Sequence, residues 1–173
     1  MMMSPALRKL ALMAHVTTAV GWVGAVLSFL VLAIAGVRSA DDHTVRAAYT
    51  AMNLLVRYVI VPIAFASVVS GLVSALGTKW GLFRHYWVLI KLVLTVVALA
   101  ILLVQLAPIA SLAAAAADPL SSSTAHPEAK RPLIHAAGGL IVLLFVQVLG
   151  VYKPRGMTRY GWRREQHGSS PPT

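Results

Sequence analysis

The chain has 173 residues, a formal net charge of +10 and no cysteine. Hydrophobic residues make up 58% of it, against about 45–50% in ordinary globular proteins, and charged residues 12%, against about 25%. This composition argues against a water-soluble enzyme. The lack of cysteine excludes disulfides, thiolate nucleophiles and thiolate metal ligands. We therefore expect an all-α integral membrane protein.

Four apolar stretches are long enough to cross a bilayer, which takes about 20 helical residues for a hydrocarbon core of about 30 Å. They run over about 10–37, 47–77, 86–110 and 133–152. Because lipid offers the backbone no hydrogen-bond partner, each is expected to be a helix. A signal peptide is the alternative for the first stretch, but that run is about twice the usual 7–15 residues. The predicted fold is a single domain, a four-helix membrane bundle with a basic, partly disordered tail at 153–173.

Lysine and arginine are distributed unevenly between the two sides of this bundle. Nine of the fifteen lie at the N-terminus, in the second loop and in the tail, whereas four lie in the first and third loops. Cytoplasmic segments are enriched in these residues, so both termini are expected in the cytoplasm of a bacterial inner membrane. The charge is thus a topology signal, and no nucleic-acid partner is expected.

The tail combines aromatic rings with five positive charges between Lys153 and Arg164. Such a segment favours adsorption to anionic lipid, and contact with a protein partner is the alternative. Ser67, Gly71 and Ala75 are small residues spaced by four, which indicates close packing of helices in lipid. A second copy of the chain or another membrane protein is a further candidate partner.

Ionisable residues inside the predicted spans are candidate functional residues, because a charge at the bilayer centre costs about 2.5–3.5 kcal/mol on insertion scales. Arg57 lies ten residues into the second span, one turn after Asn53 and close to Pro62. Lys91 lies five residues into the third span, and His15 five residues into the first. Structural roles are the alternative: Arg57 can bond to Asn53 or to carbonyls freed by Pro62, and Lys91 can extend to the headgroups.

Lys91 begins a narrow polar stripe that is expected to face the bundle interior. Its other members follow at i+4, i+7 and i+14: Thr95, Ala98 and Gln105. The predicted spans contain no acid, since all five acidic residues lie in loops or the tail. Membrane carboxylates are the usual carriers of protons and cations, so their absence argues against a pump. It also means that Arg57 and Lys91 must find amides, carbonyls, water, lipid phosphate or an anionic ligand.

Pairs of histidines in a four-helix bundle can hold haem b. His15 and His135 would lie roughly 20 Å apart along the bilayer normal, so they cannot clamp one haem. His15 with His85 is the remaining pair, and Lys91 and Arg57 are candidate charge partners for haem b or a quinone. A lone membrane histidine is otherwise an interhelical hydrogen bonder.

A metal site on the outer face is a further hypothesis. His43, His126 and His135 are all predicted near that face, together with acids such as Asp41 and Glu128. Imidazole and carboxylate ligands suit zinc, copper(II) or nickel. Metal binding there would favour passage of copper or another metal across the membrane.

Several short motifs resemble a group of bacterial four-span membrane proteins of the domain-of-unknown-function type. They are His15, Trp22 and Gly24, then Ser70-Gly71, then the segments 81–91, 151–156 and 159–163, so that the resemblance covers about 8–164. It implies a fold and a location but no reaction. More distantly, the chain is similar to the membrane domain of copper-resistance D proteins. That kinship would imply copper import or tolerance, although the methionine-rich elements expected for copper(I) are missing from the sequence.

From these observations we expect a non-enzymatic, multi-pass inner-membrane protein that is transport-related or accessory to a membrane complex. An electron-transfer module that binds haem b or a quinone is the first alternative. Passage of copper or another metal is the second.

Overall fold

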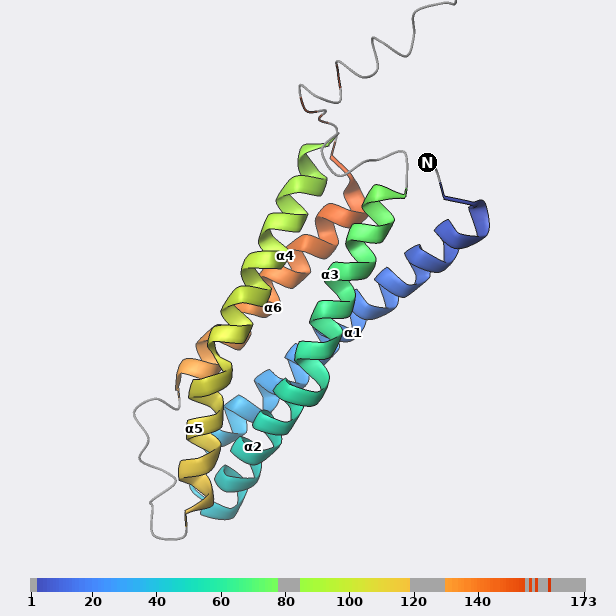
Figure 1. Ribbon diagram of the computed structural model, residues 1–173. Coiled ribbons are helices and arrows are strands. Elements are labelled where there is room, and N and C mark those ends of the chain that lie inside the picture. Colours follow the sequence, from blue (N-terminus) through green and yellow to red (C-terminus); the bar gives the residue numbers. More distant parts are fainter. Residues whose placement is uncertain are drawn as a thin grey trace, which may run out of the picture.

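The computed structural model describes residues 3–77, 85–118, 130–154, 156, 158 and 162. Its elements are α1 (Pro5–Arg38), α2 (Asp42–Leu55), a π-helical turn η1 (Val56–Ile60), α3 (Val61–Leu76), α4 (Tyr86–Val104), α5 (Leu106–Ala117) and α6 (Lys130–Tyr152). Within the described residues, four helical segments are long and apolar enough to cross a membrane. The predicted all-α, four-helix membrane bundle is therefore confirmed (Figure 1).

The bundle has two distinct ends. At the terminal end, α1 and α4 begin and α3 and α6 finish, whereas α1 and α5 finish and α2 begins at the distal end (Figure 1). Helix α1 contacts α2, α3 and α6, and α5 packs mainly on α2. Helix α6 begins beside the junction of α4 and α5, so it does not reach the distal end (Figure 1).

Helix α1 is much longer than a bilayer requires. Its 34 residues correspond to about 51 Å at 1.5 Å per residue. Ser4 caps its first turn by accepting a hydrogen bond from the Leu7 amide at 3.4 Å, and Pro5 occupies the first position, where its missing N–H costs nothing. Its buried residues all lie from Trp22 onward, in the distal half of the helix.

The second predicted span is one helical rod with an irregular centre. It begins at Asp42, five residues before the predicted start, because Asp41 caps the helix with bonds to the amides of His43 and Thr44. The π-helical turn at 56–60 lies directly before Pro62, which cannot donate a backbone hydrogen bond. Proline disturbs the helical hydrogen bonding of the turn before it, and in this rod the disturbance takes the form of the π-helical turn.

The third predicted span is divided at Gln105, a turn residue between α4 and α5. Helix α5 carries the alanine-rich segment that follows, and Asp118 ends it in an extended conformation. Arg46 of α2 fastens this end, since its Nη1 donates hydrogen bonds to the carbonyl oxygens of Ala116 and Asp118.

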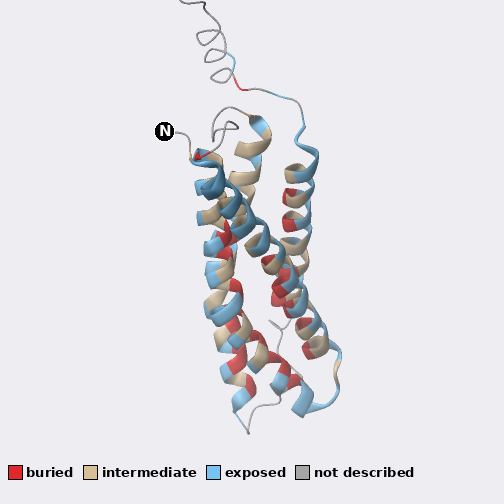
Figure 2. Ribbon diagram, turned by 90° about the vertical axis from the view of Figure 1, so that its right-hand side faces the viewer, coloured by how far each residue is buried: buried red, intermediate tan, exposed pale blue. Residues whose placement is uncertain are grey.

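Helix α6 has about the length that is needed to cross a bilayer. Its 23 residues span about 35 Å, close to a hydrocarbon core of about 30 Å. Figure 2 shows exposed positions along the helices. Large hydrophobic side chains are exposed along α1, η1, α3, α4 and α6, including Val31 and Ile34 in the last part of α1, whereas α2 exposes Leu54 alone and α5 exposes none. The exposed residues of α2 and α5 are instead small or polar, such as Thr50 and Ser111.

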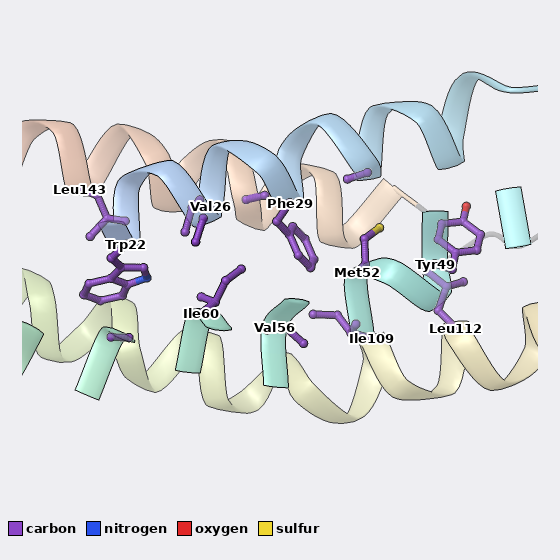
Figure 3. Packing of buried hydrophobic residues seen from close by; sticks show 14 of the residues in the cluster. Trp22, Val26, Phe29, Tyr49, Met52, Val56, Ile60, Ile109, Leu112 and Leu143 are labelled. Carbon is purple, nitrogen blue, oxygen red and sulfur yellow. The ribbon is translucent and has the colours of Figure 1, made fainter. Parts of the chain in front are cut away.

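On α2, α4 and α6, the exposed large hydrophobic residues nearest the distal end are Leu54, Val104 and Ile134, and we call the exposed apolar surface of the bundle up to this level the lipid-facing belt. We use the name distal cap for the helices beyond it, namely α2, α5 and residues 30–38 of α1. In the cap, Tyr49 and Met52 of α2 and Leu112 of α5 belong to the same buried cluster that continues along the bundle to Trp22 and Leu143 (Figure 3). The first part of the second predicted span therefore belongs to this distal cap, in which α2 and α5 expose small or polar residues while Val31 and Ile34 of α1 remain exposed.

Candidate functional site

An apolar cavity of about 360 Å³ lies inside the bundle, where the lipid-facing belt meets the distal cap. We call it the interhelical cavity. Its walls come from α1, η1, α4, α5 and α6. Figure 3 shows several of its side chains converging from these elements: Trp22, Phe29, Val56, Ile109 and Leu143.

Gln105 supplies a hydrogen-bond donor to this wall. The turn between α4 and α5 places its side chain against the cavity, and its amide nitrogen Nε2 is buried without a partner among the described residues. Leaving a buried donor unpaired costs about 1–3 kcal/mol. The bundle therefore holds a donor that an acceptor inside the cavity would satisfy.

His135 supplies an acceptor to the same cavity. Its Nδ1 lies 2.8 Å from the carbonyl oxygen of Arg131. A carbonyl oxygen can only accept, so Nδ1 carries the hydrogen and Nε2 keeps a lone pair. The cavity is thus apolar except for one amide donor and one imidazole acceptor.

The cavity is open toward lipid between α4 and α6. Val97 and Ile101 of α4 and Ile134 of α6 line it and are also exposed on the surface of the bundle. A Cβ placed on Gly138 or Gly139 would meet no atom within 4 Å, so these glycines border open space. Because these residues belong to the lipid-facing belt, a ligand can enter from the bilayer.

A second, polar site lies nearer the terminal end. It surrounds a cavity of about 20 Å³, which is room for about one water molecule. All four membrane helices contribute to it, through His15 of α1, Ser67 of α3, Lys91 and Thr95 of α4, and Gln147 of α6. We call these five residues the polar cluster. Trp22 and Leu143 line both cavities and separate the two sites.

His15 is fixed in this cluster by hydrogen bonds to α3. Its Nδ1 lies 3.1 Å from the carbonyl oxygen of Ser67 and 3.4 Å from Ser70 Oγ, and Thr18 Oγ1 lies 3.2 Å from Ser70 Oγ. Nδ1 therefore donates to Ser67, and Nε2 has no protein partner among the described residues. A Cβ on Gly71 would lie 2.9 Å from His15 Cε1, so only glycine lets the ring approach α3 this closely.

Lys91 reaches into the cluster across the surface of α6. Its Nζ would lie 3.1 Å from a Cβ on Gly150, so the absence of a side chain there admits the ammonium group. Thr95 Oγ1 donates to the Lys91 backbone carbonyl at 2.7 Å. Lys91 Nζ itself makes no hydrogen bond to the described protein atoms. The predicted stripe faces the interior, with Lys91 and Thr95 in the cluster and Ala98 and Gln105 on the interhelical cavity.

Arg57 lies elsewhere, on the exposed outer surface of η1. Its Nε donates to Asn53 Oδ1 at 3.0 Å, the structural partner considered from the sequence. Leu54, one turn before it, is the last large hydrophobic residue that α2 exposes. Arg57 therefore lies on the outer surface of the rod, next to the last exposed large hydrophobic residue of α2, and not in the bundle interior.

The haem pair considered from the sequence does not fit this arrangement. His85 occupies the N-cap position of α4 without a side-chain cap bond, and its ring is tilted by 52° against that of Trp87, with 6.4 Å between the ring centroids. It lies six residues before Lys91, or about 9 Å along the helix axis. The cavity beside His15 has room for about one water and not for a macrocycle. His15 and His85 are therefore not brought together around a haem-sized space.

The metal hypothesis finds no cluster within the described residues, where no group of three His, Asp or Glu side chains gathers. His43 is exposed near the start of α2, and His135 is exposed beside the interhelical cavity on α6. His126 and Glu128, as well as most of the basic tail, lie outside the described residues.

Sequence reasoning named most of the polar cluster but missed the interhelical cavity. Gln105 was recognised as part of a stripe, yet nothing in the sequence indicated that α6 would begin beside it. Gly138 and Gly139 were a usable signal, because small residues that do not pack against a neighbour leave space in a bundle. No protein-family model, curated protein or solved structure matches this chain.

Proposed function

We propose that this chain is a bacterial inner-membrane protein that binds a lipid-phase ring compound bearing carbonyl oxygens, of the quinone class, in the interhelical cavity. The observation that carries the proposal is the buried, unpaired Nε2 of Gln105 in an otherwise apolar wall. Such a protein would act as an accessory to membrane electron transfer. Both termini would lie in the cytoplasm, in keeping with the excess of lysine and arginine at that side.

The size of the cavity supports this class of ligand. Its volume of about 360 Å³ is more than twice that of the roughly 150 Å³ cavity that takes benzene. It also falls at the lower end of the usual range for ligand pockets, about 300–1,000 Å³. A substituted six-membered ring with part of an apolar chain is therefore a suitable occupant.

The polar groups support it as well. Gln105 Nε2 can donate to a ring carbonyl, and the lone pair on His135 Nε2 can accept from a ring hydroxyl. One site would thus suit both the oxidised and the reduced form of a quinone. The opening between α4 and α6 supports delivery from the bilayer, where such compounds dissolve.

The experiment is to identify and compete the bound compound. Protein purified in mild detergent from its native membrane is extracted with organic solvent, and the extract is analysed by mass spectrometry. We expect a quinone to co-purify at a stoichiometric level, and Gln105→Leu to reduce its occupancy. Gln147→Leu is the matched control, because it makes the same change in the polar cluster.

Two results would contradict the proposal. One is a purified, folded protein that neither carries a quinone nor binds an added short-chain quinone in titration. The other is equal quinone occupancy in the wild type and in Gln105→Leu, since the donor would then have no role. A Soret band in the absorbance spectrum would instead support haem, the other ligand considered from the sequence.

A further inference from the structure

We propose that the polar cluster at the terminal end is a binding site for a monatomic, monovalent anion such as chloride, and that anion binding is linked to protonation of His15. This site is separate from the interhelical cavity, and the proposal does not depend on a quinone. It rests on the small cavity, on the charge of the groups around it and on their unused hydrogen bonds.

Among the described residues, no acidic side chain lines the cavity of the polar cluster. Lys91 of α4 and His15 of α1 are the titratable groups that face the cavity, whereas α3 and α6 contribute Ser67 and Gln147, which do not titrate near neutral pH. Within the described residues the acidic side chains are those of Asp41, Asp42 and Asp118, which lie at the distal ends of α2 and α5. A charge in a low-dielectric interior is costly unless it is paired, so the ammonium of Lys91 requires a partner from outside the protein.

The hydrogen-bond inventory specifies that partner. Lys91 Nζ and the amide of Gln147 border the cavity and make no hydrogen bonds with the described residues. The ammonium donates, the Gln147 amide offers Nε2 as a donor beside its acceptor Oε1, and a protonated His15 adds Nε2–H as a third donor, because its Nδ1–H is already directed to the Ser67 carbonyl. Three donors around a space for about one water suit a monatomic anion.

Protonation of His15 decides which occupant the site prefers. With neutral His15, the lone pair on Nε2 repels an anion and favours water, which can donate to it. With protonated His15, the same nitrogen donates and the cluster carries two positive charges, so an anion is favoured. By linkage, the proton and the anion each strengthen the binding of the other, within a usual coupling range of about 5- to 150-fold.

Trp22 offers a direct readout, because it lines the same cavity and bromide quenches indole fluorescence on contact. The chain has four tryptophans. Replacement of Trp80, Trp87 and Trp162 by phenylalanine leaves Trp22 as the single emitter. Bromide is then titrated at constant ionic strength into purified protein at pH 5.5 and at pH 8.

We expect saturable quenching at pH 5.5 and an apparent dissociation constant that is about 5- to 150-fold larger at pH 8. Lys91→Met should leave only linear, collisional quenching, and Gln147→Leu should weaken the saturable phase. His15→Gln should remove the pH dependence. Arg57→Leu, which removes a positive charge at the edge of the belt near the distal cap, is the control and should bind bromide as the wild type does.

The proposal is overturned by linear quenching in the folded parent protein at both pH values. It is equally overturned by saturable quenching that persists in Lys91→Met, or by an affinity that is the same at pH 5.5 and pH 8. Because the first and third results come from the parent protein itself, the test stands even if Lys91→Met does not fold.

Discussion

The hydroxyl of Tyr49 donates a hydrogen bond to the carbonyl oxygen of Gly36 at 3.1 Å, and its ring lies directly on that glycine. The last carbonyls of a helix have no partner within the helix, so Tyr49 satisfies one of them near the end of α1. Tyr49 is 2% exposed, so water cannot replace this bond. The contact joins α1 to α2 within the distal cap.

Loss of that bond gives the first prediction. Tyr49→Phe should lower the free energy of unfolding by about 1 kcal/mol, because the Gly36 carbonyl then loses its buried partner. Gly36→Ala should cost more, about 1–3 kcal/mol, since the new Cβ would lie 2.6 Å from Tyr49 Cε1. Denaturant unfolding in detergent measures both, and Tyr58→Phe, at a residue 74% exposed, should be neutral. A Tyr49→Phe protein as stable as that control would disprove the role of the bond.

The sequence predicts this fold well because lipid imposes a simple length rule. Four spans were expected and four suitable helices are present within the described residues. What the sequence could not supply was the axial offset between helices. Helix α6 is shorter than the other membrane helices and begins beside the junction of α4 and α5. Because of this axial offset, the start of the second predicted span lies in the distal cap, and Arg57 lies on the outer surface.

The candidate sites were predictable to different degrees. The polar cluster was largely foreseen, because charged residues in a membrane span are rare and conspicuous. Its geometry depends on contacts that no periodicity reveals, such as His15 against Gly71 and Lys91 against Gly150. The interhelical cavity depends on where helices fail to touch, and Gly138 and Gly139, which border it, do not indicate which neighbouring helix stays away.

Gln105 gives the second prediction. In protein freed of ligand, Gln105→Leu should raise the free energy of unfolding by about 1–3 kcal/mol, because a buried donor without a partner is removed. Thermal unfolding followed by circular dichroism is the measurement. Added quinone should stabilise the wild type but not the variant. A variant that is less stable than the ligand-free wild type would mean that Nε2 is already satisfied.

Gly71 and Gly24 form a matched pair for the third prediction. Gly71→Ala should lower stability, because its Cβ would lie 2.9 Å from His15 Cε1 and displace the ring from the Ser67 carbonyl. A cost of about 1–3 kcal/mol is usual for such overpacking. Gly24→Ala adds the same methyl group where no atom lies within 4 Å, so it should be neutral or stabilising. Equal effects of the two substitutions would show that His15 is not held against α3 as described.

Asp41 gives a prediction on pH. Its carboxylate accepts hydrogen bonds from the hydroxyl and the amide of Thr44 and from the amide of His43, and these hold its pKa below the usual value of 3.8. A group with a lowered folded pKa stabilises the protein above its unfolded pKa, and that contribution is lost as the pH falls through the folded value. The cap on α2 should therefore weaken only below about pH 4.

Comparison of the wild type with Asp41→Asn isolates this effect, because asparagine can still cap a helix but carries no charge. The wild type should be the more stable at pH 7, and the difference should vanish near pH 2. Melting temperatures across that range provide the measurement. A difference that is constant from pH 7 to pH 2 would assign the effect to shape and not to charge.

The final prediction concerns where the bilayer ends. Because the chain has no cysteine, single cysteines can be introduced without removing any other. Thr50→Cys on α2 and Ser111→Cys on α5 are exposed positions in the distal cap, whereas Val69→Cys on α3 and Ile141→Cys on α6 lie in the lipid-facing belt. A water-soluble, membrane-impermeant maleimide should label the first pair and spare the second, since a thiol in hydrocarbon neither ionises nor meets the reagent.

The same variants separate the position of the cap from its orientation. If the cap faces away from the cytoplasm, the maleimide should label Thr50→Cys and Ser111→Cys in cells whose inner membrane is intact and whose outer membrane has been made permeable. Labelling that requires disruption of the inner membrane would reverse the orientation but keep the cap. If neither cap position reacts even in detergent-free membrane fragments open on both sides, α2 and α5 are embedded in lipid. The belt would then extend to the distal end, and the small, polar surfaces of α2 and α5 would have to be covered by another protein chain.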